Sequence, residues 1–176
     1  MDIAAELAAF DGKHTDTLES MAARLSPEPS VIVELCRLAR QDEATLQTAA
    51  TWLLKRIDED GGSFSGDQVD ALLDLFDRVT HWEAKLHLLQ MLPGIAIPAA
   101  RKDALRQLFA GPGYLGDANK FVRAWSYGAL ADLATQHAEF RPAVAKILAT
   151  GQLEDAASVR ARIRNILKRA PWATSA

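Results

Sequence analysis

Apolar residues recur at every third or fourth position along most of the chain, and clusters of Gly, Pro and polar residues interrupt this pattern at intervals. This spacing places apolar side chains on one face of an α-helix, whereas no segment alternates apolar and polar residues as a half-buried strand does. The pattern therefore predicts an all-α fold. We expect two N-terminal helices over 2–10 and 15–25, then four helix pairs: 30–40 with 42–57, 67–79 with 80–92, 98–110 with 119–136, and 139–150 with 156–169.

Turn-forming residues between these helices predict how the chain is organised. The loops at 58–63 and 111–116 are rich in Gly and separate successive pairs, while most joints within pairs are short, as antiparallel neighbours require. Asp67 is a candidate N-cap because its side chain can accept from free amides of the first turn. We expect one domain over 1–176, comprising an N-terminal helical cap (1–29), four repeats (30–170) and a tail (171–176).

A short motif recurs through the predicted pairs. A charged residue followed by Ala and, two positions later, usually an apolar residue appears four times, with steps of 40, 40 and 37 residues. Repeats of this length are typical of helix pairs that stack because no single pair can bury its own apolar face. The sequence therefore predicts an α-α superhelix of about four helix pairs. The repeated alanines are Ala44, Ala84, Ala124 and Ala161.

Two of these repeats carry a further pattern. An acid lies six residues before a Val-Arg pair in Asp117-Ala-Asn-Lys-Phe-Val-Arg123, and again in Glu154-Asp-Ala-Ala-Ser-Val-Arg160. This pattern resembles the HEAT repeat, and the resemblance extends over residues 30 to 170. It implies a HEAT-like solenoid in which Asp117, Arg123, Glu154 and Arg160 form a structural ladder between stacked repeats. The first two repeats depart from the pattern.

The same resemblance implies a binding surface. HEAT-like units usually place their second helices on the concave side, where partners bind. The row expected to be exposed there, and therefore to bind a partner, is Gln47, His87, Tyr127 and Arg164.

Charge is unevenly distributed along the chain, whose net charge is −3. Residues 1–140 have a net charge of −8, whereas residues 141–176 have +5, and the last predicted helix contains five basic residues. This helix could attract a phosphate-rich or acidic partner. Basic residues near a helix C-terminus also complement the helix dipole, so a purely structural capping role is the alternative interpretation.

Chemistry-bearing motifs are scarce. His81 and His87 are six residues apart, which does not match the i, i+4 spacing of a helical metal pair, and Cys36 has no second cysteine. We therefore expect no catalytic residues, no metal and no cofactor. The absence of a signal-peptide pattern, a long apolar stretch or a disulfide framework predicts a cytoplasmic protein without a membrane span.

One enzymatic interpretation remains open. Some DNA glycosylases for alkylated bases resemble this fold, and they hold the lesion with concave Trp residues and an Asp. Trp125 and Asp132 are seven residues apart and share a helical face, so they are either core residues or a site. The acidic body of the chain disfavours binding to a polyanion.

These observations predict a non-catalytic scaffold or adaptor that binds a protein partner on the concave face of a HEAT-like solenoid. The alternative is a nucleic-acid-associated protein, such as a glycosylase-like repair protein, which strong salt dependence of binding would distinguish. Self-association is a third hypothesis.

Overall fold

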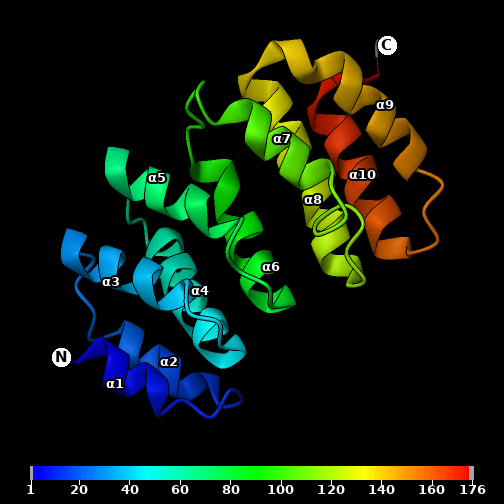
Figure 1. Ribbon diagram of the computed structural model, residues 1–176. Helices are drawn as coiled ribbons and strands as arrows, with labels where there is room; N and C mark the ends of the chain where they lie inside the picture. Colours follow the sequence, from blue (N-terminus) through cyan, green and yellow to red (C-terminus); the bar gives the residue numbers. More distant parts are fainter. Residues whose placement is uncertain (1, 175–176) are drawn as a thin grey trace. The chain divides into compact units, whose positions relative to one another are not determined.

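The computed structural model describes residues 2–174, and the part of the chain that it describes is all-α, with no strand (Figure 1). This confirms the predicted all-α class, whereas the α-α superhelix stays a prediction. The chain divides into two compact units, Met1–Met91 (unit 1) and Leu92–Ala176 (unit 2). A single domain over 1–176 stays a prediction.

Unit 1 is built around its longest helix, α4, which packs against α1, α2, α3 and α6. Leu53 and Leu54 of α4 are fully buried in its core. The first helices of the two pairs, α3 and α5, also pack against each other. The helices of unit 1 are α1 (Ile3–Ala8), α2 (Thr15–Ala22), α3 (Pro29–Ala39), α4 (Ala44–Glu59), α5 (Gly66–Leu75) and α6 (Trp82–Met91).

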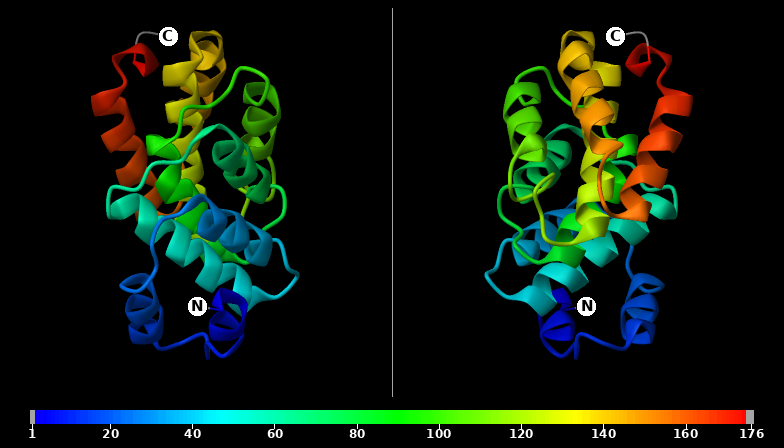
Figure 2. Two further views of the ribbon diagram at one scale, coloured as in Figure 1. Left: turned by 90° about the vertical axis from the view of Figure 1, so that its left-hand side faces the viewer. Right: turned by 90° about the vertical axis from the view of Figure 1, so that its right-hand side faces the viewer.

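Unit 2 is built in the same way around α8. This helix lies between α7 and α10, as both views in Figure 2 show, and it also packs against α9. Val122, Leu130 and Leu133 of α8 are fully buried. The elements of unit 2 are η1 (Leu92–Gly94), α7 (Lys102–Ala110), α8 (Lys120–Gln136), η2 (Ala138–Phe140), α9 (Arg141–Gly151), α10 (Ala157–Arg169) and η3 (Pro171–Ala173).

Local sequence signals set the ends of several helices. Pro29 occupies the first turn of α3, where its missing N–H costs nothing. Helix α5 begins at a capping box formed by Ser65 and Gln68, so the prediction of Asp67 as its N-cap is wrong. Asn119 caps α8 by accepting from the amide of Phe121 at 2.9 Å. Each predicted helix is present, and most differences from the predicted ranges lie at the helix ends.

Burial of the repeated alanines is uneven. Ala84 and Ala124 are buried, whereas Ala44 is exposed at the start of α4. Cys36 is buried in α3, and this burial raises the pKa of its thiol to about 11. Cys36 therefore packs as a small buried hydrophobe.

Candidate functional site: the cleft between α8 and α10

Gln47 is the first member of the row predicted to be exposed, but only 1% of its surface is accessible. Its amide nitrogen donates to the carbonyl of Gln41 at 2.9 Å, and its amide oxygen accepts from the backbone amides of Thr80 and His81 at 3.0 and 3.2 Å. The side chain therefore fastens the loop before α6 to α4. The prediction that Gln47 is exposed is wrong, because this loop covers it.

His87 is mostly enclosed between α6 and α4. Its ring nitrogen Nδ1 lies 3.1 Å from the hydroxyl of Thr51, and the same atom of His81 lies 2.9 Å from the hydroxyl of Thr48. Burial, together with the nearby Lys55 ammonium, lowers the pKa of His87 to about 4, so the ring is neutral at pH 7. His87 of α6 and His81, which directly precedes α6, thus use their rings to hold α6 against α4.

The other two members of the row lie in unit 2 and differ from each other. Tyr127 is buried, and its ring packs so closely on Gly151 that a Cβ there would lie 2.5 Å from ring carbon atoms. The prediction that Tyr127 is exposed is therefore wrong, because α9 packs against it. Arg164 is exposed on α10, and no described residue pairs with it through a hydrogen bond or an ion pair.

The predicted ladder residues meet in unit 2, with backbone carbonyls as the main acceptors. Arg123 donates to the carbonyl of Asp117 at 2.9 Å, and its Nε lies 3.5 Å from a carboxylate oxygen of Glu154. Arg160 donates to the carbonyl of Glu154 at 2.5 Å. Each arginine therefore ties the start of its own helix to the preceding loop, and Arg123 also reaches the next helix pair.

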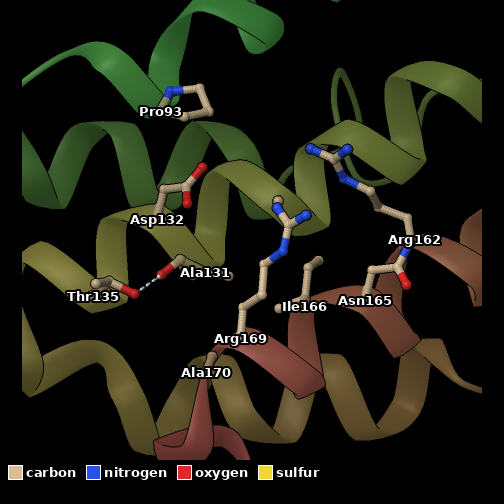
Figure 3. Close-up of a pocket in the computed structure, with 10 residues that line it drawn as sticks. Pro93, Ala131, Asp132, Thr135, Arg162, Asn165, Ile166, Arg169 and Ala170 are labelled. Carbon is tan, nitrogen blue, oxygen red and sulfur yellow. Dashed lines mark hydrogen bonds between the residues drawn. The ribbon is translucent and has the colours of Figure 1, made fainter.

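A cleft of about 300 Å³ lies between α8 and α10 in unit 2. Figure 3 shows Arg162 and Arg169 extending from α10 toward α8, with Asp132 on the opposite wall. The cleft thus combines two guanidinium groups and one carboxylate with apolar walls. Its lining residues are Pro93, Gly128, Ala131, Asp132, Thr135, Arg162, Asn165, Ile166, Arg169 and Ala170.

Arg162 is held in place by stacking. Its guanidinium carbon lies 3.5 Å from the centroid of the Trp125 ring, which is a cation–π arrangement. Gly128, one turn along α8, leaves room for the group, because a Cβ there would lie only 3.2 Å from an Arg162 nitrogen. Burial lowers the pKa of Arg162, which nevertheless stays charged at pH 7.

Asp132 is the acidic group of the cleft. Burial raises the pKa of its carboxyl to about 6, although the charges of Arg162 and Arg169 act in the opposite direction. Within residues 2–174, neither Asp132 nor either arginine takes part in a hydrogen bond or salt bridge. Three charged groups therefore face one cleft without a hydrogen-bond or salt-bridge partner among the described residues, and two of them, Asp132 and Arg162, are partly desolvated.

Two neutral polar groups complete the lining. Asn165 lies one turn from Arg162 on α10 and is exposed, so its amide can both donate and accept. The hydroxyl of Thr135 donates to the carbonyl of Ala131 at 2.8 Å, which leaves its oxygen able to accept.

Sequence reasoning placed Trp125 and Asp132 on one face of a helix and left their role open. It did not assign Arg162, Asn165 or Arg169 to the same place. The signal was present, because the spacing of these three residues, i, i+3 and i+7, puts them on one face of α10. What the pattern could not reveal is that this face meets α8.

The two units also differ in charge. Unit 2 contains 12 Lys and Arg against 6 Asp and Glu, a net charge of +6, whereas unit 1 contains 8 against 17, a net charge of −9. The cleft with its two arginines therefore belongs to the basic unit, which favours an anionic ligand there.

Between residues 2 and 174, no group of three or more His, Cys, Asp or Glu side chains is placed to hold a metal ion. None of the helices formed by these residues is both long enough and apolar enough to cross a bilayer. Comparisons with protein-family models, curated protein sequences and solved structures found no significant match.

Proposed function

We propose that the protein is a non-catalytic interaction module of the HEAT-like α-solenoid type, and that a segment of a partner protein binds unit 2 in the α8–α10 cleft. The observation that carries this proposal is a set of three charged groups around a cleft of about 300 Å³, Asp132, Arg162 and Arg169, which form no hydrogen bond or salt bridge with a described residue. A ligand that pairs with them would recover interactions that folding leaves unmade.

The arrangement of the helices supports the HEAT-like part of the proposal. In both units the second helices of successive pairs pack side by side, α4 with α6 and α8 with α10. Arg123 contacts Glu154 of the following pair, as a ladder between repeats requires. Stacked repeats commonly bind extended partners along such adjacent helices.

Affinity capture with matched variants tests the proposal. The tagged full chain, the cleft variant Arg162→Ala/Arg169→Ala and the control variant Arg164→Ala/Lys168→Ala would each be incubated with nuclease-treated lysate of the source cells. Both variants remove two positive charges from α10, but only the first changes the cleft. We expect a protein retained by the wild type and the control to be lost from the cleft variant. Identical retention by all three would contradict the proposal.

A nucleic-acid-associated function is the second candidate, because Trp125, Asp132 and Arg162 meet at one place in a unit of net charge +6. This function predicts that nucleic acid is recovered without nuclease, and that its retention falls steeply between about 50 and 200 mM salt. A protein partner held in the cleft predicts a shallower salt dependence and resistance to nuclease.

A further inference from the structure

The donors and acceptors of the α8–α10 cleft define the chemistry of a ligand that fits it. Arg162 and Arg169 offer only N–H donors, so they require an acceptor that is preferably anionic. Asp132, when ionised, offers only acceptors and requires a donor beside that anion. A fitting ligand therefore presents an anionic group and an N–H or O–H donor within the span of one small cleft.

We propose that the cleft binds an acidic side chain of the partner segment, with Arg162 and Arg169 holding its carboxylate and Asp132 accepting from a backbone N–H beside it. This inference rests on the proposed function and specifies the class of partner. A peptide provides both groups within one residue, because every non-Pro residue has a backbone N–H. A DNA phosphodiester backbone provides acceptors only, and its charge is repelled by Asp132.

Arg162 is the better prepared of the two arginines. Trp125 covers one face of its guanidinium, while the N–H edges of the group carry no hydrogen bond to a described residue. A planar guanidinium binds a carboxylate through those edges, in its own plane. Stacking therefore fixes the orientation of the group without using its donors, which reduces the entropy lost on binding.

The apolar part of the lining suits the rest of such a segment. Ala131, Ile166 and Ala170 are buried beneath the charged groups, and Pro93 is exposed at the rim. The methylene groups of a Glu side chain can contact these surfaces while the carboxylate lies between the arginines. We expect Glu to be preferred over Asp for this reason.

The test is a binding titration of the full chain with defined peptides. The main probe is a rhodamine-labelled peptide of alternating Glu and Ala residues, acetylated and amidated at its ends, and the matched probe replaces every Glu with Gln. Fluorescence anisotropy measures affinity, and Trp emission reports contact with the cleft, because Arg162 lies on Trp125. Unlabelled oligo-dT serves as a competitor.

We expect the Gln peptide to bind at least about tenfold more weakly than the Glu peptide, because hydrogen bonds to charged groups are the strong ones. Arg162→Ala should weaken binding of the Glu peptide about tenfold. Arg162→Lys keeps the positive charge and is less disruptive to the fold than Arg162→Ala. It should weaken binding of the Glu peptide at least about threefold, because it loses the planar donors. Arg164→Ala, which removes an equal charge from outside the cleft, should change the affinity less than twofold.

Equal binding of the Glu and Gln peptides, or equal effects of the Arg162 and Arg164 substitutions, would overturn the inference. Displacement of the Glu peptide by a lower concentration of oligo-dT than of unlabelled Glu peptide would also overturn it, in favour of nucleic acid. If the Glu peptide does not bind, but affinity capture retains a protein that is lost from the Arg162→Ala/Arg169→Ala variant, only the assignment of an acidic side chain is contradicted. If the Glu peptide binds as expected, but affinity capture retains no protein that the Arg162→Ala/Arg169→Ala variant loses, the proposed function is contradicted and the carboxylate site is supported.

Discussion

The contact between α4 and α6 in unit 1 joins the same kind of elements as the contact between α8 and α10 in unit 2, since each joins the second helices of successive pairs. The two contacts differ in whether their polar side chains have hydrogen-bond partners within the fold. In unit 1, Gln47, Thr48 and Thr51 are hydrogen-bonded to the backbone or the histidines of the next helix pair. In unit 2, Asp132, Arg162 and Arg169 face a cleft and form no hydrogen bond or salt bridge with a described residue. Folding therefore satisfies the polar groups of the α4–α6 contact. We infer that the charged groups of the α8–α10 contact are available to a ligand.

The largest expected effect is a loss of stability at the α4–α6 contact, whose polar side chains are hydrogen-bonded. Gln47→Ala removes the hydrogen-bond partner of two part-buried backbone amides and of one carbonyl, so we expect it to lower the free energy of unfolding by about 3 kcal/mol. Urea denaturation followed by circular dichroism measures this change. The control is Gln90→Ala on α6, a half-buried glutamine, which should stay within about 0.5 kcal/mol of the wild type. Equal effects of the two substitutions would show that the Gln47 bonds contribute little.

The second prediction is that unit 1 loses stability at acidic pH because of His87. Because the pKa of His87 is lowered to about 4 in the folded chain, the unfolded chain binds more protons between pH 6.5 and 4. The contribution of His87 to stability is therefore complete above pH 6.5 and is lost as the pH falls toward 4. We expect this loss to reach about 2 kcal/mol after allowing for the partial exposure of the ring.

Denaturation of the wild type and of His87→Gln across this pH range isolates the contribution of that residue. The difference between the two proteins should change steadily from pH 6.5 to 4, with the wild type losing more stability. A difference that does not vary with pH would contradict the assigned burial of the ring.

The third prediction concerns Asp132 in unit 2, whose effect on stability changes with pH in the direction opposite to that of His87. The pKa of Asp132 is raised to about 6, so the folded chain binds more protons than the unfolded chain between pH 3.8 and 6. The ionised carboxylate therefore destabilises the fold as the pH rises through this range. Asp132→Asn should increase the free energy of unfolding by about 1 kcal/mol at pH 8 and leave it almost unchanged at pH 3.5. A loss of stability at pH 8 would mean that Asp132 is satisfied within the fold.

The smallest expected effect separates stability from binding at Gly128. Ala is the better helix former, so Gly128→Ala should stabilise α8 by up to about 1 kcal/mol. The added methyl group would approach an Arg162 nitrogen to 3.2 Å, so the guanidinium must shift by a few tenths of an ångström. We expect a higher melting temperature together with weaker binding of the Glu peptide. Stronger binding would argue against preorganisation of Arg162 by stacking.

The sequence was sufficient to predict most of the helices because their apolar spacing is regular. It was less informative at helix ends, where two polar residues compete to cap, as Ser65 and Asp67 do before α5. It failed at Gln47 because the side chain is covered by a loop from a different helix pair, which periodicity within one helix does not encode.

The cleft illustrates a similar limit. The face of α8 with Trp125 and Asp132 and the basic character of α10 were both readable from the sequence. Their combination depends on how the two helices pack, and on the small residue Gly128 that admits the Arg162 guanidinium. A spacing pattern within each helix cannot supply that information.

The most direct test of the comparison between the two contacts is a titration of the isotopically labelled full chain with the Glu peptide, followed by two-dimensional NMR of backbone amides and arginine Nε–H groups. We predict saturable shifts in 125–135 of α8 and 162–170 beside it, including the Nε–H of Arg162, and no comparable shifts in α4 or α6. Shifts centred on α4 and α6, or no saturable shifts at all, would contradict the account.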